Sequence, residues 1–413
     1  MRTRRCETGT LELGAGLEVL VSASLATLAP DERLDVVTAS RAAALELSAW
    51  TRKAGHVVVD ERREGPAFVV TLERAPHDPV LALQAPEAAA PPALGGGSFP
   101  TAELRRLAGP APAHADPAAG LVPLAAVPER SAARYDWSIS RRDRVWTDKL
   151  AGLSDRAARA QWSATTDIPW EAATSLKPDV ERAVAQVMTY IAQNEYAAYY
   201  VPARYLHQVH PAYVEVLTWL ASHVHDEARH VEVFTKRALA GGQRSYALAA
   251  TELSLQTLLD ERDFSAAALL LNVLGEGTFL DLLSFVAAHA PDAATATAAR
   301  LAHQDERRHV QFGIAHIRHR LAREPGERER LVAAVEARAA KLVDLDGLSP
   351  VVVESLVLMS SPSLQPADIG EAGAAVRELM GRMHRNRVRR LRAAGFDAAT
   401  ARDLSDLHTP NLM

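Results

Sequence analysis

Cysteine is almost absent from this chain of 413 residues, which contains only Cys6. One thiol cannot form an intramolecular disulfide or a cysteine-rich metal site. Its scarcity fits the reducing cytoplasm, where we expect the protein to reside. A basic excess is missing as well, because 46 Lys and Arg residues face 51 Asp and Glu residues, for a formal net charge of -5. We therefore expect no nucleic-acid-binding surface.

Long hydrophobic runs are also lacking. The most apolar stretches, near residues 266–274 and 351–359, are shorter than the roughly 18–20 residues that cross a bilayer, so we expect no membrane span. The N-terminal segment MRTRRCETGT has basic residues but no apolar region after them, which argues against a signal peptide. Aromatic residues make up only 5% of the chain, whereas alanine, the best helix former, is abundant. The composition therefore favours helices.

The first 75 residues alternate between strand-like and helix-like runs. We expect strands at 10–13, 33–38, 56–60 and 67–73, and helices at 18–28 and 41–54. A charged turn ending in Gly65-Pro66 separates the last two strands, which is typical of a hairpin. The order β-α-β-α-β-β predicts a small α+β domain at residues 1–75.

Pro, Ala and Gly dominate residues 76–130, which include Gly95-Gly96-Gly97. No periodic apolar pattern survives there, so we predict a linker, partly extended.

From about residue 131 to residue 413, apolar residues recur with helical periodicity. The expected helices cover 179–208, 211–240, 245–290, 292–323, 327–344, 369–394 and 396–406. Pro211, Gly241-Gly242, Pro291 and Pro325-Gly326 leave only short connections between them. Short connections make neighbouring helices antiparallel, which predicts a bundle with extra C-terminal helices.

Two segments of these helices share the pattern D-E-x-R-H, namely Asp226–His230 and Asp305–His309. In each, Glu and His are three residues apart and lie on one helix face. A carboxylate with an imidazole suits iron or manganese better than a metal that prefers thiolates. Each motif follows a helix with one glutamate on its apolar stripe, Glu195 or Glu276. An unpaired charge there would cost several kcal/mol, so both glutamates need partners.

The sequence separations place these residues at one level. Glu195 and Glu227 are 32 residues apart, and Glu276 and Glu306 are 30 apart. An antiparallel helix pair returns to the same height after about 15 residues up and 15 down, at roughly 1.5 Å each. Four such carboxylates could not stay ionised in a core without bound cations. The sequence therefore predicts a site for two metal ions with the ligands Glu195, Glu227, His230, Glu276, Glu306 and His309.

This arrangement resembles the ferritin-like di-iron carboxylate proteins, in which two helices give one Glu each and two others give Glu-x-x-His. The resemblance covers about residues 180–323. It implies a ferritin-like four-helix bundle, two iron ions (Fe/Fe, with Mn/Fe as the alternative) and O2 as co-substrate. It also implies that Glu195, Glu227 and His230 mainly coordinate one iron. Glu276, Glu306 and His309 would mainly coordinate the other, and the catalytic carboxylates Glu227 and Glu306 would bridge the two.

The aspartate before each motif glutamate matches the monooxygenase and ribonucleotide-reductase branches of that superfamily. There it holds the histidine of the partner motif, which here implies Asp226 with His309 and Asp305 with His230. The resemblance further implies that Arg229 and Arg308 pair with these buried aspartates.

Several neighbouring residues are further candidates. His223, one turn before Glu227, could be an extra ligand or proton relay, although a lone helix histidine is more often structural. Tyr199, one turn after Glu195, could be a redox or pocket residue, although an aromatic residue at such spacing more often belongs to a core. Phe279 is a further possible site residue. Multicomponent hydroxylases carry a threonine where this chain has Leu280, and Thr278 is expected to face elsewhere.

Two other positions bear on the type of site. The p-aminobenzoate N-oxygenase group uses a seventh, histidine ligand where this chain has Ala302. Gly275 and Gly277 flank Glu276 and would serve either local distortion beside a substrate cavity or close helix packing.

The N-terminal unit resembles TusA-type sulfur-carrier domains, chiefly through A-W-x-x-x-x-G-H at Ala49–His56. Those domains carry Cys-Pro at the start of their first helix, where this chain has Gly14–Val19 without a cysteine. We therefore expect a docking, dimerisation or covering role instead of sulfur relay.

Taken together, these features predict a di-iron oxygenase or oxidase that acts on a small organic substrate by C- or N-oxygenation. Such an enzyme needs an external electron donor. The protein could also form a homodimer. The alternatives are an iron-handling ferroxidase or storage protein and a non-catalytic ferritin-like scaffold. Storage cages use a compact bundle alone, so the appended domain and C-terminal helices weigh against storage.

Overall fold

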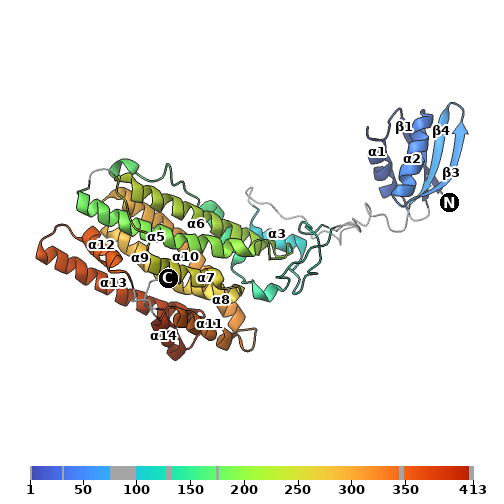
Figure 1. The fold of residues 1–413 in the computed structure, drawn as a ribbon. Coiled ribbons are helices and arrows are strands. Elements are labelled where there is room, and N and C mark those ends of the chain that lie inside the picture. Colours follow the sequence, from blue (N-terminus) through green and yellow to red (C-terminus); the bar gives the residue numbers. More distant parts are fainter. Residues whose placement is uncertain are drawn as a thin grey trace. The chain divides into compact units, whose positions relative to one another are not determined.

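The computed structural model describes residues 2–29, 32–74, 99–126, 133–173, 176–343 and 348–408. The chain divides into two compact units, a small unit with a sheet at the N-terminus and a larger helical unit (Figure 1). The predicted fold class, mainly α with a small N-terminal α+β unit, is confirmed.

The N-terminal unit has the predicted order β-α-β-α-β-β. Its elements are β1 (Arg2–Gly9), α1 (Leu17–Ala26), β2 (Glu32–Thr38), α2 (Arg41–Lys53), β3 (Val57–Glu64) and β4 (Ala67–Glu73). The sheet order is β1-β2-β4-β3, with β1 parallel to β2 and β4 antiparallel to both of its neighbours. Helix α1 contributes Leu17, Val21 and Leu25 to a core shared with β2 and β4.

One strand was predicted in the wrong place. The first strand is Arg2–Gly9, whereas the prediction put it at residues 10–13. Its sequence RTRRCETG shows no apolar alternation, because β1 is an edge strand and, of its residues, only Cys6 and Thr8 are buried.

The helical unit is organised around two helix pairs. Helix α5 (Pro178–Tyr205) packs along α6 (Val214–Ala240), and α9 (Glu276–His289) packs along α10 (Ala293–Leu321), as Figure 1 shows. Helix α9 continues directly from α8 (Phe264–Ala268) through η4 (Leu269–Gly275), a π-helical segment. These elements carry every predicted metal ligand.

Additional elements surround the two pairs. They are α3 (Thr101–Ala108), η2 (Arg142–Arg144), α4 (Leu150–Arg159), η3 (Trp170–Ala173), α7 (Ala249–Asp260), α11 (Glu327–Lys341), α12 (Pro350–Ser360), α13 (Pro366–Ala393) and α14 (Ala398–Leu407). Helix α12 packs against α5, and α13 packs against both α9 and α14. The predicted C-terminal helices at 369–394 and 396–406 correspond to α13 and α14.

Helix α3 falls inside the predicted linker at 76–130, of which residues 76–98 and 127–130 lie outside the described residues. Its eight residues include no buried one, so the apolar pattern gave no signal. Arg105 instead anchors α3 to α6 through Glu215, with Nη2 2.7 Å from Oε2.

The continuous helix Phe264–His289 is long and apolar enough to cross a membrane by length and composition, with a mean hydropathy of 1.5. On this point the expectation of no such segment was wrong. Its apolar window is 89% buried inside the bundle, as is typical of a core helix in a soluble protein.

Candidate metal centre

The six predicted ligands lie at one level of the helical unit. Four helices supply them: Glu195 from α5, Glu227 and His230 from α6, Glu276 from α9, and Glu306 and His309 from α10. None of the six is more than 1% exposed.

Their donor atoms form two groups, each compact enough to hold one metal ion. The first contains Glu195, Glu227, His230 and Glu306, and the second contains His223, Glu227, Glu276 and His309. Within each group, one ligand atom per residue lies within 4.8 Å of all the others. Because Glu227 belongs to both groups, the two metal positions are adjacent.

Both motif histidines direct Nδ1 at the same two carboxylates. His309 Nδ1 lies 2.9 Å from Glu227 Oε1 and 3.4 Å from Glu306 Oε2. His230 Nδ1 lies 3.3 Å from Glu227 Oε2 and 3.4 Å from Glu306 Oε1. Glu227 and Glu306 therefore stand between the histidines, where bridging ligands would have to lie.

The donor atoms at this centre fit metal ions because the protein leaves them unsatisfied. Among the described residues, both carboxylate oxygens of Glu227 and Glu306, Glu195 Oε1 and Nδ1 of both histidines have no hydrogen-bond partner. Buried polar atoms without partners are rare and cost about 1–3 kcal/mol each. Seven such atoms converging on one place match the carboxylate and imidazole set that iron and manganese take.

Burial and neighbouring charges also shift the pKa values of these groups. Burial and the charges of Glu227 and Glu306 raise the pKa of Glu195 well above its ordinary value. Burial also raises the pKa of Glu276. Burial alone would lower the pKa of His309, but its close contacts with Asp226, Glu227 and Glu306 raise it well above normal. The metal-free centre therefore retains protons that bound cations would displace.

Behind each histidine stands an aspartate from the other motif. Asp226 Oδ2 lies 3.3 Å from His309 Nε2, and Asp305 Oδ2 lies 3.3 Å from His230 Nε2. This is the crossed pairing that the resemblance implies. Each aspartate fixes the imidazole so that Nδ1 faces the carboxylates.

Two arginines close this outer layer. Arg229 Nη2 donates to Asp226 (2.5 Å) and Asp305 (2.9 Å), and Arg308 Nη2 donates to Asp226 (2.8 Å) and Asp305 (2.5 Å). Burial would raise the pKa of Asp226, but the hydrogen bond with His309 and the arginine charges hold it well below normal. Both aspartates therefore stay ionised, as holding a histidine requires.

Trp162, for which the sequence predicts no role at the site, also joins this layer. Its Nε1 donates to Asp305 Oδ2 at 2.7 Å, and its ring lies 5.0 Å from the Arg229 guanidinium. It comes from the segment after α4, whose sequence gives no signal for the contact.

His223 belongs to the centre. It is 1% exposed, and its Nε2 lies 3.0 Å from Glu276 Oε1 and 3.4 Å from Glu227 Oε1. Its ring stacks on His309 with centroids 3.8 Å apart. The signal was present in the sequence as H-x-x-x-E-x-x-H on α6, whereas the matching position on α10 is Ala302.

The π-helical segment η4 ends immediately before Glu276. Such segments are rare and often mark functional sites. Within it, Asn272 Nδ2 donates to Glu276 Oε2 at 2.7 Å, a contact that sequence reasoning missed. Gly275 belongs to this distorted segment, whereas Gly277 permits close packing, because a Cβ there would lie 2.6 Å from Arg390 Nε.

The remaining candidates lie away from both groups. Thr278 Oγ1 donates to Leu274 O and accepts from Arg387 Nη1 on α13, so it faces elsewhere, as expected. The ring of Phe279 lies 6.2 Å from that of Tyr190. Tyr199 packs edge-on against the exposed Tyr200.

Comparison with protein-family models and with curated protein sequences found no match. Among solved structures, an R2-like ligand-binding oxidase with an aerobically reconstituted Mn/Fe cofactor aligns at 18% identity and a TM-score of 0.40, covering 64% of this chain and 91% of that chain. A single-residue variant of this oxidase, also with an aerobically reconstituted Mn/Fe cofactor, aligns at 18% identity and a TM-score of 0.44, covering 60% and 94%. At these values the matches carry no conclusion about activity, which must come from the side chains of this chain.

Proposed function

We propose that this protein is a non-haem O2-activating oxidoreductase whose centre holds two metal ions, either two irons or one manganese and one iron. The observation that supports the proposal is the convergence of seven unsatisfied, buried carboxylate and imidazole atoms in two groups that share Glu227. A reduced metal pair of this kind supplies the electrons and open coordination positions with which O2 reacts.

The residues of the chain have separate tasks in this proposal. Glu195, His230, Glu276 and His309 would each hold one metal, while Glu227 and Glu306 would join the two. His223 would be a seventh ligand, on the metal that Glu276 and His309 hold. Asp226 and Asp305 keep the histidines in one tautomer, and Asn272 orients Glu276. The bundle excludes water, which strengthens every charge interaction at the centre.

The reaction follows from the surroundings of this centre. A small, mainly apolar cavity of about 20 Å³, the passage, is lined by Phe264, Leu271 and Phe312. His223 and Asn272, which contact Glu276, also line it. A seven-ligand set in a dry core next to this passage suits oxygenation or oxidation of a small organic molecule. We place the protein in the cytoplasm and assign its electrons to an external donor. A ferroxidase would instead need a path along which iron ions enter and leave, and the passage beside Glu276 is mainly apolar.

The test begins with metal loading. Anaerobic titration with Fe(II), and with Mn(II) plus Fe(II), should saturate at about two metals per chain. Admission of O2 should then give rapid oxygen consumption, with products detected by mass spectrometry from a panel of small substrates. Accumulation of Fe(III) far above two per chain would favour the ferroxidase alternative. Absence of stoichiometric metal would contradict both functions.

A further inference from the structure

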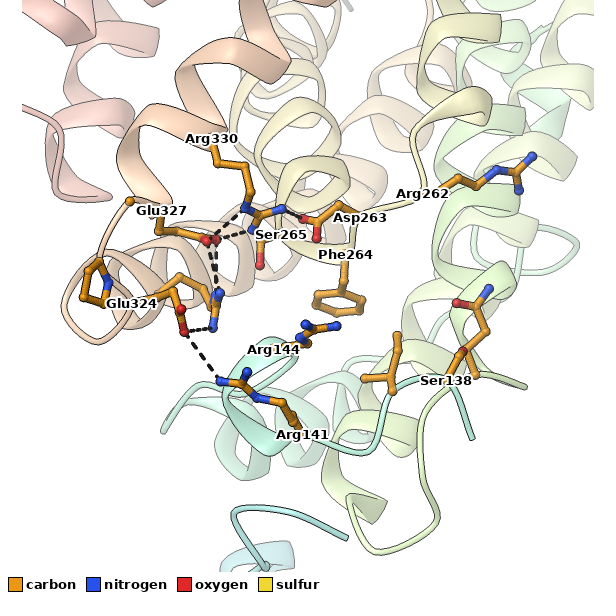
Figure 2. A pocket seen from close by; sticks show the side chains of 15 residues that line it. Ser138, Arg141, Arg144, Arg262, Asp263, Phe264, Ser265, Glu324, Glu327 and Arg330 are labelled. Carbon is orange, nitrogen blue, oxygen red and sulfur yellow. Dashed lines mark hydrogen bonds and ion pairs between the residues drawn. The ribbon is translucent and has the colours of Figure 1, made fainter. Parts of the chain in front are cut away.

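An open cavity of about 530 Å³ lies on the helical unit near the start of α8 (Figure 2). Four segments enclose it: the chain around η2, the turn after α5, the start of α8, and the turn between α10 and α11. None of the residues proposed above to hold a metal belongs to its wall.

The wall of this cavity is positively charged. It contains five arginines, Arg141, Arg144, Arg262, Arg320 and Arg330, against three acids, Asp263, Glu324 and Glu327. This excess of two positive charges contrasts with the net charge of -5 of the whole chain. An electrostatic well of this sign concentrates anions.

The arginines differ in how far they are committed to partners. Arg320 and Arg330 both pair with Glu327, and Arg330 also lies 2.6 Å from Asp263. Arg144 and Arg262 are exposed and form no ion pair with any residue that the structure describes. These two guanidinium groups are therefore available to a ligand.

The passage, the much smaller cavity of about 20 Å³, adjoins this one. Phe264 lines both the cavity and the passage. The other side chains along the passage are mainly apolar, among them Val201, Tyr205, Leu220, Leu271 and Phe312. His223 and Asn272, both of which contact Glu276, also line it. The passage therefore lies between Phe264, at the wall of the basic cavity, and two residues that contact a predicted metal ligand.

One polar atom interrupts the apolar wall of the passage. The hydroxyl of Tyr205 is buried and has no hydrogen-bond partner among the described residues. Its ring packs edge-on against Phe264 with centroids 4.9 Å apart. A buried hydroxyl without a partner destabilises the fold, and a polar atom of a bound molecule would relieve this.

We propose that substrates of the proposed oxidoreductase enter by this cavity and are small oxyanions with an apolar body. The oxyanion, a carboxylate or a phosphate, binds Arg144 and Arg262 at the mouth. The apolar body passes Phe264 toward Glu276, and a polar atom of the substrate meets the Tyr205 hydroxyl. Because the passage holds little more than one water molecule, the Phe264 side chain rotates to admit the body.

Binding is measured by calorimetry on the metal-free and metal-loaded chain, so that its result does not depend on turnover. The probes are benzoate and hexanoate, phenyl phosphate as the phosphate counterpart, and benzamide and hexanol as neutral matches. We expect the oxyanions to bind, the neutral compounds to bind at least about fivefold more weakly, and added salt to reduce the difference. Equal binding of charged and neutral compounds would overturn the proposal.

Matched variants locate the binding site. The double variant Arg144→Gln/Arg262→Gln should lose most of the preference for oxyanions, whereas Arg159→Gln, an exposed arginine on the wall of another cavity, should keep it. Tyr205→Phe should weaken binding of 4-hydroxybenzoate, a further probe with a second polar group, and leave hexanoate unchanged. Unchanged oxyanion binding in the double variant would contradict the assignment.

The failure of this inference is distinguishable from failure of the proposed function. If the wild-type chain takes up two metals and consumes O2 but binds no oxyanion, the substrate class is wrong and the function stands. If it binds oxyanions through Arg144 and Arg262 without taking up metal, the binding site stands and the function falls.

Discussion

The helical unit contains two halves that repeat one design, and they differ at the lone glutamate. In the first half, Glu195 lies within the uninterrupted helix α5, and its Oε1 has no partner among the described residues. In the second half, Glu276 follows the π-helical segment η4 and contacts Asn272 and His223. The small apolar cavity is lined by His223 and Asn272, which contact this second carboxylate, and by no residue that has a polar contact with Glu195 in the described part of the chain. The surroundings of the two lone glutamates therefore differ, and in the proposed function the position at Glu276 is the one that faces substrate.

The largest expected effect comes from a residue that both halves share. Glu227→Ala should reduce bound metal from about two per chain to below about one, because Glu227 belongs to both ligand groups. Metal analysis after anaerobic loading and gel filtration measures this. Glu232→Ala, an exposed glutamate on the same helix, is the control and should retain both metals. Full metal content in Glu227→Ala would show that the two groups do not share this ligand.

Asp226 and Asp305 allow the metal affinity of each position to be lowered separately. Asp226→Asn should lower affinity mainly for the metal held by His309, and Asp305→Asn mainly for the metal held by His230, each by about 10–100-fold. Anaerobic calorimetric titration with Fe(II) resolves the two binding steps. Asp260→Asn, at the exposed end of α7, should change neither step. If both variants affect the same step, the crossed pairing is wrong.

His223 tests the inequality of the two positions directly. His223→Gln should weaken only the metal next to Glu276, by about tenfold, and leave the Glu195 position unchanged. The same two-step titration shows this, with His225→Gln as control because His225 is exposed on the same helix. Equal weakening of both positions would remove the distinction between the position at Glu276 and the position at Glu195.

The smallest effect concerns how α10 approaches the π-helical segment. A Cβ at Gly313 would lie 2.6 Å from Asn272 Cβ, whereas the corresponding position on α6 is Phe234. Gly313→Ala should therefore destabilise the protein by about 1–3 kcal/mol through overpacking. Thermal unfolding measures the loss. Gly370→Ala, with open space around it in α13, should be neutral or stabilising. An unchanged Gly313→Ala variant would mean that the approach does not need a glycine.

The arrangement of the six predicted ligands could be predicted from the sequence, because this arrangement depends on periodicity and spacing along four long helices. Separations of 32 and 30 residues within antiparallel pairs leave little freedom in the level of Glu227 and Glu306. The order of elements along the N-terminal unit was predictable for a similar reason, since its buried strands β2 and β4 are apolar.

Other features could not be read in this way. The residues of η4, LLLNVLG, look like any apolar helix, because a π turn differs only in which carbonyl accepts each N–H. Trp162 and Asn272 reach the centre through tertiary contacts that leave no periodic mark. Strand β1 was misplaced because an edge strand with charged residues on both faces lacks the alternation that identifies buried strands.

The π-helical segment also affects how this centre can change during evolution. A π turn holds one residue more than the α-helical turn it replaces, so it arises or disappears through a single-codon insertion or deletion. Loss of one residue from Leu269–Gly275 would turn this segment into an α-helix and keep the relative rotation of α8 and α9. It would change the backbone between Asn272 and Glu276. Descendants of one bundle could therefore acquire different substrates by a change of length at one point, while the halves that hold the metals stay the same.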